Sequence, residues 1–380
     1  MKNIPIPRAL LWGIVLFLIT TGCPSGGGSG GGLLEGAGTT VLYTSNGGAN
    51  TVSGFLVDPQ GLLTATTPPT VATGGTNAQW VSITPNGQFL YVSNQGSANL
   101  SAYTMNATTG TLTATSPATF STGGGSAPQA VTVSPNGQFV YVATASTETV
   151  AGFSIGLGGV LTPTSPATFP TGGASAAGIA ITPNGQHLYV TNTGSNNISG
   201  YSIGGGGVLT ATTPATVSTG PASSPIGIAI TPNNAFLYIA NSGTNEVAGF
   251  TIGAGGVLTP TTPQTFPTGG GSAPKRIVVS PNGLYVYVTN SGTNEVAAFT
   301  IGAGGTLTPT TPATFSTGLG SAPIGITVSA TSEFLYTANS GNSTVGTFVI
   351  GGGGRLSPTT PSTFATTSST PTGIAIPGRP

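Results

Sequence analysis

The stretch His187–Ile203, HLYVTNTGSNNISGYSI, decides the fold, because a near copy of it, YVYVTNSGTNEVAAFTI, stands at Tyr285–Ile301. Each copy consists of an apolar alternating run, a break at Asn-x-Gly and a second alternating run. Alternation of apolar and polar residues is typical of β-strands, and Asn and Gly favour tight turns. The stretch therefore predicts a β-hairpin that the chain builds more than once.

The hairpin pattern occurs seven times with one internal spacing. Its marker tyrosine recurs at intervals of 48 to 50 residues. A branched apolar residue follows nine positions after each marker, and an aromatic residue follows twelve positions after it. The markers are Tyr43, Tyr91, Tyr141, Tyr189, Tyr238, Tyr287 and Tyr336. Seven copies in one register predict a repeat architecture.

Each repeat contains four predicted strands. The first, as in GIAITPNG, ends at a Pro-Asn-Gly turn, and the second and third form the hairpin. The fourth, as in VLTATTPATVSTG, contains prolines, which cannot donate to a strand ladder and so belong on an edge strand. The Asn that ends most second strands is interpreted as a turn former that bonds its own backbone. A four-stranded unit of this length predicts an all-β, seven-bladed β-propeller.

The two ends of the repeat region complement each other. The first copy begins at a second strand, TTVLYTSN, with no first strand before it. The C-terminal PTGIAI, residues 371–376, is an orphan first strand that resembles PIGIAI at residues 225–230. We therefore predict that the C-terminal strand completes the N-terminal blade, which would remove two exposed sheet edges.

Composition excludes several classes of partner. The 380 residues include 63 Gly and 31 Pro, but 37% are hydrophobic and come in short alternating runs, which argues against disorder. Six basic and six acidic residues give a net charge of zero. Nucleic-acid binding and polybasic membrane binding both need clustered Lys and Arg, so neither is expected. We expect a monomer.

The first residues predict export. Lys2 and Arg8 precede the apolar run 9–19, which is too short to span a bilayer but suits a secretory signal. Cys23, the single cysteine, follows small residues as in a bacterial lipoprotein processing site, so we predict lipid attachment there and a location facing the periplasm or on the cell surface. The alternative is an ordinary cleaved signal with an incidental thiol. The predicted division is signal peptide 1–22, Gly/Ser-rich tether 23–38, propeller 39–376 and tail 377–380.

The literal YVTN at residues 189–192 and 287–290, preceded by TPNG or SPNG, resembles the YVTN-repeat propellers. That group is similar to the seven-bladed propeller lactonases, which include a bacterial 6-phosphogluconolactonase. The resemblance covers residues 39–376 and implies the propeller fold. Blade motifs describe packing, so they carry less information about activity.

One position near the start of each innermost strand marks the mouth of the central channel. Five of its seven occupants are tiny, as crowding around an axis requires: Ala130, Gly178, Gly227, Gly325 and Gly373. The exceptions are Trp80 and Arg276, and Lys275 precedes the latter. An indole and a cation can hold a carbohydrate or anionic ligand by stacking and charge-assisted hydrogen bonds. The alternative is that they close the channel through a cation–π contact.

Glu246 and Glu295 occupy one loop position in adjacent blades. Paired carboxylates can serve as acid and base or hold a cation, so both are candidate ligand-binding residues. The alternative is a pair of solvated loop tips, since the surrounding NSGTNEVA is itself duplicated.

The proton-transfer groups of the lactonases are missing. The resemblance implies a Pro-Arg-His run and a Glu after a later strand's Asn, but this chain has Pro274-Lys275-Arg276 and Ser291. His187, the single histidine, stands where other blades carry Phe or Tyr and is interpreted as a substituted core aromatic. The sequence shows no His/Cys cluster for zinc and no phosphate loop. We therefore assign no catalytic residue, metal or cofactor.

These observations favour a non-catalytic, lipid-anchored scaffold that presents a neutral face to a carbohydrate or protein ligand. Two alternatives remain. The first is a lactonase-like sugar-lactone hydrolase with an unorthodox site near Arg276. The second is a structural component of the cell envelope.

Overall fold

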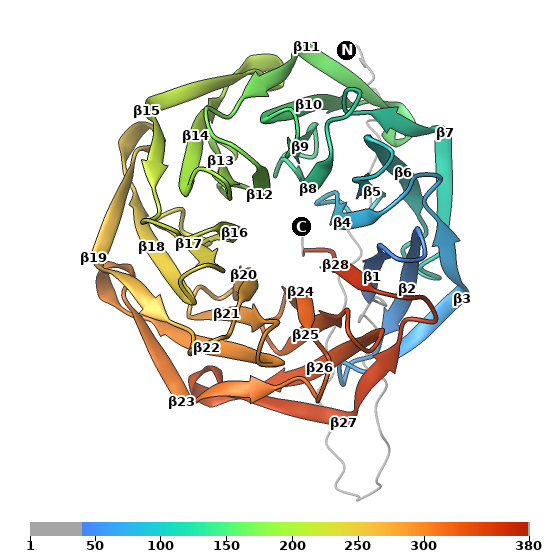
Figure 1. The fold of residues 1–380 in the computed structure, drawn as a ribbon. Helices are drawn as coiled ribbons and strands as arrows, with labels where there is room; N and C mark the ends of the chain where they lie inside the picture. Colours follow the sequence, from blue (N-terminus) through green and yellow to red (C-terminus); the bar gives the residue numbers. More distant parts are fainter. Residues whose placement is uncertain (1–39, 379–380) are drawn as a thin grey trace, which may run out of the picture. The chain divides into compact units, whose positions relative to one another are not determined.

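Seven four-stranded antiparallel sheets form a closed ring in a computed structural model, which describes residues 40–378 (Figure 1). The sheets are numbered here as blades 1 to 7 from the blade that contains Tyr43 to the blade that contains Tyr336. The predictions made for residues 1–39, including those for Cys23, lie outside the described residues. The all-β, seven-bladed propeller predicted from the repeat is confirmed.

Each blade is built in the same order from the channel outward. The innermost strands of blades 1 to 7 are β28 (Pro371–Ala375), β4 (Ala78–Ile83), β8 (Pro128–Val133), β12 (Ala176–Ile181), β16 (Pro225–Ile230), β20 (Pro274–Val279) and β24 (Pro323–Val328). The second strands are β1 (Thr40–Asn46), β5 (Phe89–Asn94), β9 (Phe139–Thr144), β13 (His187–Asn192), β17 (Phe236–Asn241), β21 (Tyr285–Asn290) and β25 (Phe334–Asn339).

The outer half of each blade is equally regular. The third strands are β2 (Thr51–Val57), β6 (Asn99–Met105), β10 (Thr149–Ile155), β14 (Asn197–Ile203), β18 (Glu246–Ile252), β22 (Glu295–Ile301) and β26 (Thr344–Ile350). The outermost, proline-containing strands are β3 (Leu63–Ala72), β7 (Leu112–Ser121), β11 (Leu161–Pro170), β15 (Leu209–Ser218), β19 (Leu258–Pro267), β23 (Leu307–Ser316) and β27 (Leu356–Ala365). Short 3-10 turns join third to fourth strands in blades 3 to 7: η1 (Leu157–Gly159), η2 (Gly205–Gly207), η3 (Ala254–Gly256), η4 (Ala303–Gly305) and η5 (Gly352–Gly354).

The ring closes as the sequence predicts. Strand β28 pairs antiparallel with β1, with Thr44 opposite Ile374 and Ser45 opposite Gly373. Ile374 is 2% exposed and packs in a cluster with Leu42 and Phe55 of the same blade and Tyr336 of blade 7. In Figure 1 the red C-terminal strand lies against the blue first blade. Both ends of the described chain therefore contribute to blade 1.

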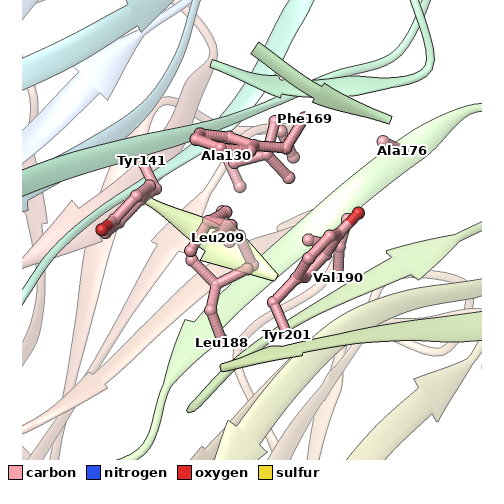
Figure 2. Close-up of a cluster of buried hydrophobic side chains, with 11 residues drawn as sticks. Ala130, Tyr141, Phe169, Ala176, Leu188, Val190, Tyr201 and Leu209 are labelled. Atoms are coloured by element: carbon pink, nitrogen blue, oxygen red, sulfur yellow. The ribbon is translucent and has the colours of Figure 1, made fainter. Parts of the chain in front are cut away.

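The hydrophobic core lies between blades. Figure 2 shows one cluster in which Tyr141 and Phe169 of blade 3 meet Leu188, Val190 and Tyr201 of blade 4. Side chains alternate between the two faces of each sheet, and each blade buries both faces against its neighbours. A hydrophobic layer of this kind therefore lies at every junction between blades. The described residues contain no helix that is long and apolar enough to cross a membrane.

The asparagines at the ends of the second strands are not turn formers, so that interpretation was wrong. Asn46 is fully buried, and its Nδ2 donates to Ser53 Oγ at 2.9 Å and Thr51 Oγ1 at 3.0 Å. Asn94 makes the equivalent bonds to Asn99 and Ser101. In these two blades the amide ties the second strand to the third, whereas the amides of Asn241 and Asn290 donate to backbone carbonyls between blades, Thr219 O at 3.4 Å and Thr268 O at 3.2 Å.

Candidate functional site

Trp80 and Arg276 meet across the central channel. They belong to β4 of blade 2 and β20 of blade 6, which are not neighbours in the ring. The Arg276 Cζ lies 4.4 Å from the centroid of the Trp80 ring, which is a close cation–π contact. The contact that the sequence left as an alternative is therefore present, and the two residues partly close the channel.

A local irregularity in the strands turns both residues toward the channel. The register of β4 against β5 shifts between Ala78 and Trp80, and β20 shifts similarly against β21 between Pro274 and Ile277. The freed backbone N–H groups donate to hydroxyls of the second strand, Trp80 N to Ser93 Oγ and Arg276 N to Thr289 Oγ1, both at 3.1 Å. A bulge of this kind re-aims a side chain without breaking the blade.

The small residues at the equivalent positions have the steric reason that the sequence predicts. A Cβ on Gly227 would lie 2.8 Å from the Arg276 Cα, and one on Gly373 would lie 2.8 Å from the Trp80 Cα. Neighbouring innermost strands are thus in backbone contact around the axis. Small residues permit this approach, so space for large side chains exists at few points of the ring.

A cavity of about 50 Å³ lies beside this contact. It is lined by Trp80, Ala130, Gly178, Ile179, Ile228, Arg276, Ile277 and Ile326. A volume of this size holds a water molecule or a single carbonyl oxygen, and a whole sugar would have to lie outside it. The cavity is therefore suited to one oxygen atom of a ligand.

Arg276 is the polar group of the cavity. Its Nε is buried and has no hydrogen-bond partner among the described residues. Burial in these apolar surroundings lowers the pKa of Arg276 to about 10. A buried N–H without a partner costs about 1–3 kcal/mol, a cost that a ligand oxygen in the cavity would recover.

The other candidates are not part of this cavity. Lys275 is partly buried and is not among the lining residues. Glu246 and Glu295 begin the third strands β18 and β22, two strands out from the channel, and Thr314 Oγ1 donates to Glu295 at 3.0 Å. The structure does not bring these carboxylates to the guanidinium. Within residues 40–378, no group of three or more His, Cys, Asp or Glu side chains could bind a metal ion.

His187 occupies the place of a core aromatic. A Cβ on Gly256 of η3 would lie 2.5 Å from the His187 Nδ1, just as one on Gly207 would meet Phe139 and one on Gly305 would meet Phe236. The imidazole thus packs on the turn of the next blade. Its interpretation as a substituted aromatic is confirmed.

The family model of the lactonases with a seven-bladed β-propeller matches residues 36–121, 114–241 and 223–376. These segments cover most of the chain, which therefore belongs to this lactonase family. No curated protein matches the sequence.

Solved structures show the same fold. A candidate 6-phosphogluconolactonase from Bacteroides fragilis superposes with a TM-score of 0.77 at 21% identity, covering 90% of this chain and 98% of its own. One from Bacteroides uniformis gives 0.76 at 18% identity, covering 89% and 99%. The periplasmic gluconolactonase of Pseudomonas aeruginosa gives 0.74 at 19% identity, covering 90% and 99%.

These findings correct the functional prediction. The sequence favoured a non-catalytic binding or display scaffold because the His and Glu of the lactonases are replaced by Arg276 and Ser291. The family match and the gluconolactonase neighbours contradict that preference and support the lactonase-like alternative. The replacement of those two residues therefore does not place the chain outside the lactonase family.

Proposed function

We propose that this propeller hydrolyses sugar lactones at the Trp80–Arg276 cavity. The observation that carries the proposal is the buried, unpartnered Nε of Arg276 beside space for one oxygen atom. Membership of the lactonase family supports the substrate class. The sugar ring would lie outside the cavity at the channel mouth, with its carbonyl oxygen directed into the cavity.

Arg276 acts on the carbonyl oxygen of the lactone. When hydroxide from solvent attacks the carbonyl carbon, the carbonyl oxygen becomes an oxyanion, and the guanidinium stabilises that charge. The bond between the carbonyl carbon and the ring oxygen then breaks. The ring oxygen takes a proton from water, and the product is a hydroxy acid. Since the cavity lining contains no carboxylate or imidazole, the nucleophile comes from solvent.

Replacing Arg276 tests the assignment. Arg276→Ala should lower kcat/KM for a six-membered aldonolactone by about 10²–10³, the loss typical for one oxyanion donor. Hydrolysis is followed by acid release and corrected for the spontaneous reaction. Arg355→Ala, which removes an exposed cation from the turn before β27, is the matched control and should leave the rate unchanged. Equal activity of the wild type and Arg276→Ala would overturn the proposal.

The pH dependence of lactone hydrolysis follows from the ionisation of the Arg276 guanidinium. Spontaneous and catalysed hydrolysis both use hydroxide, so their ratio should be constant while the guanidinium is protonated. The pKa of Arg276 is lowered to about 10, so the ratio should fall as pH rises through 10 and the charge is lost. A ratio that rises with pH between 6 and 8 would instead indicate a general base with an ordinary histidine-like pKa.

We further propose that the chain is exported and lipid-anchored through Cys23, as the short apolar run and the processing-site pattern indicate. The periplasmic location of the Pseudomonas aeruginosa neighbour supports an envelope location. Cys23→Ser should move the protein from the membrane fraction to the soluble fraction. An unchanged distribution would contradict the anchor.

A further inference from the structure

We propose a second ligand site on the face opposite the channel mouth, a groove between blades 3 and 4 that takes a neutral saccharide. The groove has a volume of about 280 Å³. It lies at the Pro-Asn-Gly turns, and its walls are the turn around Asn136 in blade 3 and the turn around Asn184 in blade 4. Its third side is the glycine run 204–206, which leads into η2.

Two sequence features distinguish this junction. The positions compared are the residue after the turn that ends an innermost strand and the first residue of the turn between the third and fourth strands of the next blade. At the junction of blades 3 and 4 these residues are Gln138 and Gly205, a carboxamide opposite a residue without a side chain. The corresponding pairs at five other junctions are Gln88 with Leu157, Gln186 with Ala254, Ala235 with Ala303, Leu284 with Gly352 and Glu333 with Pro59, the last without a Pro-Asn-Gly turn or a 3-10 turn. None of them combines a carboxamide with glycine.

The lining determines the chemical class of the ligand. The side chains are hydroxyl and carboxamide groups together with Phe139 and Ile203, and none of them is ionisable. A charged ligand would lose its hydration without gaining a counter-charge, and a purely apolar ligand would leave the amides unpaired. A saccharide meets both requirements, because it offers hydroxyls to the amides and a C–H face to the aromatic ring.

The amides are pre-positioned for such a ligand. Asn136 Oδ1 accepts from Ser134 Oγ at 2.6 Å and from the Gln138 backbone N at 3.1 Å, which fixes the turn. Asn136 Nδ2 donates to Gln138 Oε1 at 3.1 Å, so the Nε2 of Gln138 is the donor left for a ligand. A group held in this way loses little side-chain entropy on binding.

Gly205 provides a variant that obstructs the open edge of the groove and preserves the fold. A Cβ on Gly205 would meet no atom within 4 Å, and its backbone is not in the positive-φ region. Blade 3 already carries Leu157 at the equivalent position, where the side chain is 98% exposed. Gly205→Leu should therefore place a side chain at the open edge of the groove, where it obstructs a ligand, with an unchanged melting temperature. Ala254→Leu places the same side chain on the next blade and is the matched control.

The test uses saturation-transfer NMR with maltotetraose, cellotetraose and chitotetraose as neutral probes and oligogalacturonate as a charged probe. We expect wild type and Ala254→Leu to bind at least one neutral probe with a Kd near ~1 mM. Gly205→Leu should abolish this binding, and Gln138→Leu should weaken it about tenfold, the value of one hydrogen bond. Lactone hydrolysis should be the same in all four proteins, so this site and the proposed activity fail independently.

Three results would overturn the proposal. The first is that none of the neutral probes binds to the wild type. The second is that binding survives Gly205→Leu with the same affinity. The third is that oligogalacturonate binds as tightly as the neutral probes. If Gly205→Leu fails to fold, retention of full affinity by Gln138→Leu is the overturning result.

Discussion

At the scale of single residues, His187 shows how one substitution within a repeat introduces a titratable group into a packed junction. Five other blades place Phe or Tyr on the turn glycine of the next blade. Burial lowers the pKa of His187, and its Nδ1 has no hydrogen-bond partner within residues 40–378. The neutral imidazole is therefore the form that packs at this junction.

We predict that His187 makes stability depend on pH below neutrality. In the unfolded chain its pKa is near 6.5, and in the folded protein it is lower, so the unfolded state binds more protons between these values. The free energy of unfolding should consequently fall as pH decreases from 7 toward 5. His187→Phe, which copies blades 2 and 3, should flatten this part of the profile. Thermal unfolding of both proteins at pH 7 and 5.5 measures the effect, and equal slopes would contradict it.

The sequence identified part of the candidate site. Trp80 and Arg276 were found because they interrupt a series of tiny residues, and that signal depends only on the repeat register. Their contact across the channel was one of the two interpretations that the sequence left open, and the sequence could not decide between them because the direction of each side chain depends on a bulge and its hydroxyl partner in a neighbouring strand. The asparagine interpretation failed for a related reason. An Asn side chain can bond the backbone of its own turn or buried groups of a neighbouring strand. The local sequence motif does not show which of the two it does.

At the scale of elements, the marker tyrosines connect neighbouring blades. Tyr238 OH donates to the Gly305 carbonyl of η4 at 2.9 Å, and five other markers make the equivalent bond to the following blade. Tyr336 is the exception, since its hydroxyl is buried without a partner among the described residues. The next blade there is blade 1, whose turn keeps a glycine at the acceptor position, Gly61, but carries Asp58, Pro59 and Gln60 before it. The junction that closes the ring therefore lacks this hydrogen bond.

This difference predicts that replacing a marker tyrosine by phenylalanine has opposite effects on stability at the two junctions. Tyr238→Phe should lower the free energy of unfolding by about 1–3 kcal/mol, because the buried Gly305 carbonyl loses its partner. Tyr336→Phe should be neutral or slightly stabilising, because it removes a hydroxyl that is buried without a hydrogen bond. The two values are compared by urea unfolding of otherwise identical proteins. A large loss for Tyr336→Phe would show that its hydroxyl is satisfied in solution.

At the scale of the whole molecule, the sequence was sufficient to predict ring closure, because seven copies in one register make a missing strand and an orphan strand conspicuous. The groove between blades 3 and 4 was not apparent from the sequence. It requires knowledge that Gln138 and Gly205, which are distant in the chain, face each other at a junction. The repeat specifies how blades are built, and side-chain differences between copies become informative only once their junctions are known.

Ring closure leads to a prediction about β28. Ending the chain at Thr370 should expose the edge of β1, remove the buried Ile374 and withdraw Gly373 from its contact with the Trp80 backbone. Loss of Ile374 alone corresponds to about 1.5–3 kcal/mol, and the unpaired edge favours association between chains. We therefore expect a loss of at least 2 kcal/mol in the free energy of unfolding, measured with urea, and oligomers in size-exclusion chromatography.

A circular permutation distinguishes the loss of ring closure by β28 from a general effect of shortening the chain. Moving residues 371–376 to a position before Thr40, with a Pro-Asn-Gly turn between them, makes blade 1 continuous in sequence. Because every contact of β28 is then restored, stability should return to within about 1 kcal/mol of the wild type, the usual spread for a change confined to a surface turn. A chain ending at Ile376 is the control for the loss of the last four residues. If the truncated protein is as stable as this control, β28 does not close the ring in solution.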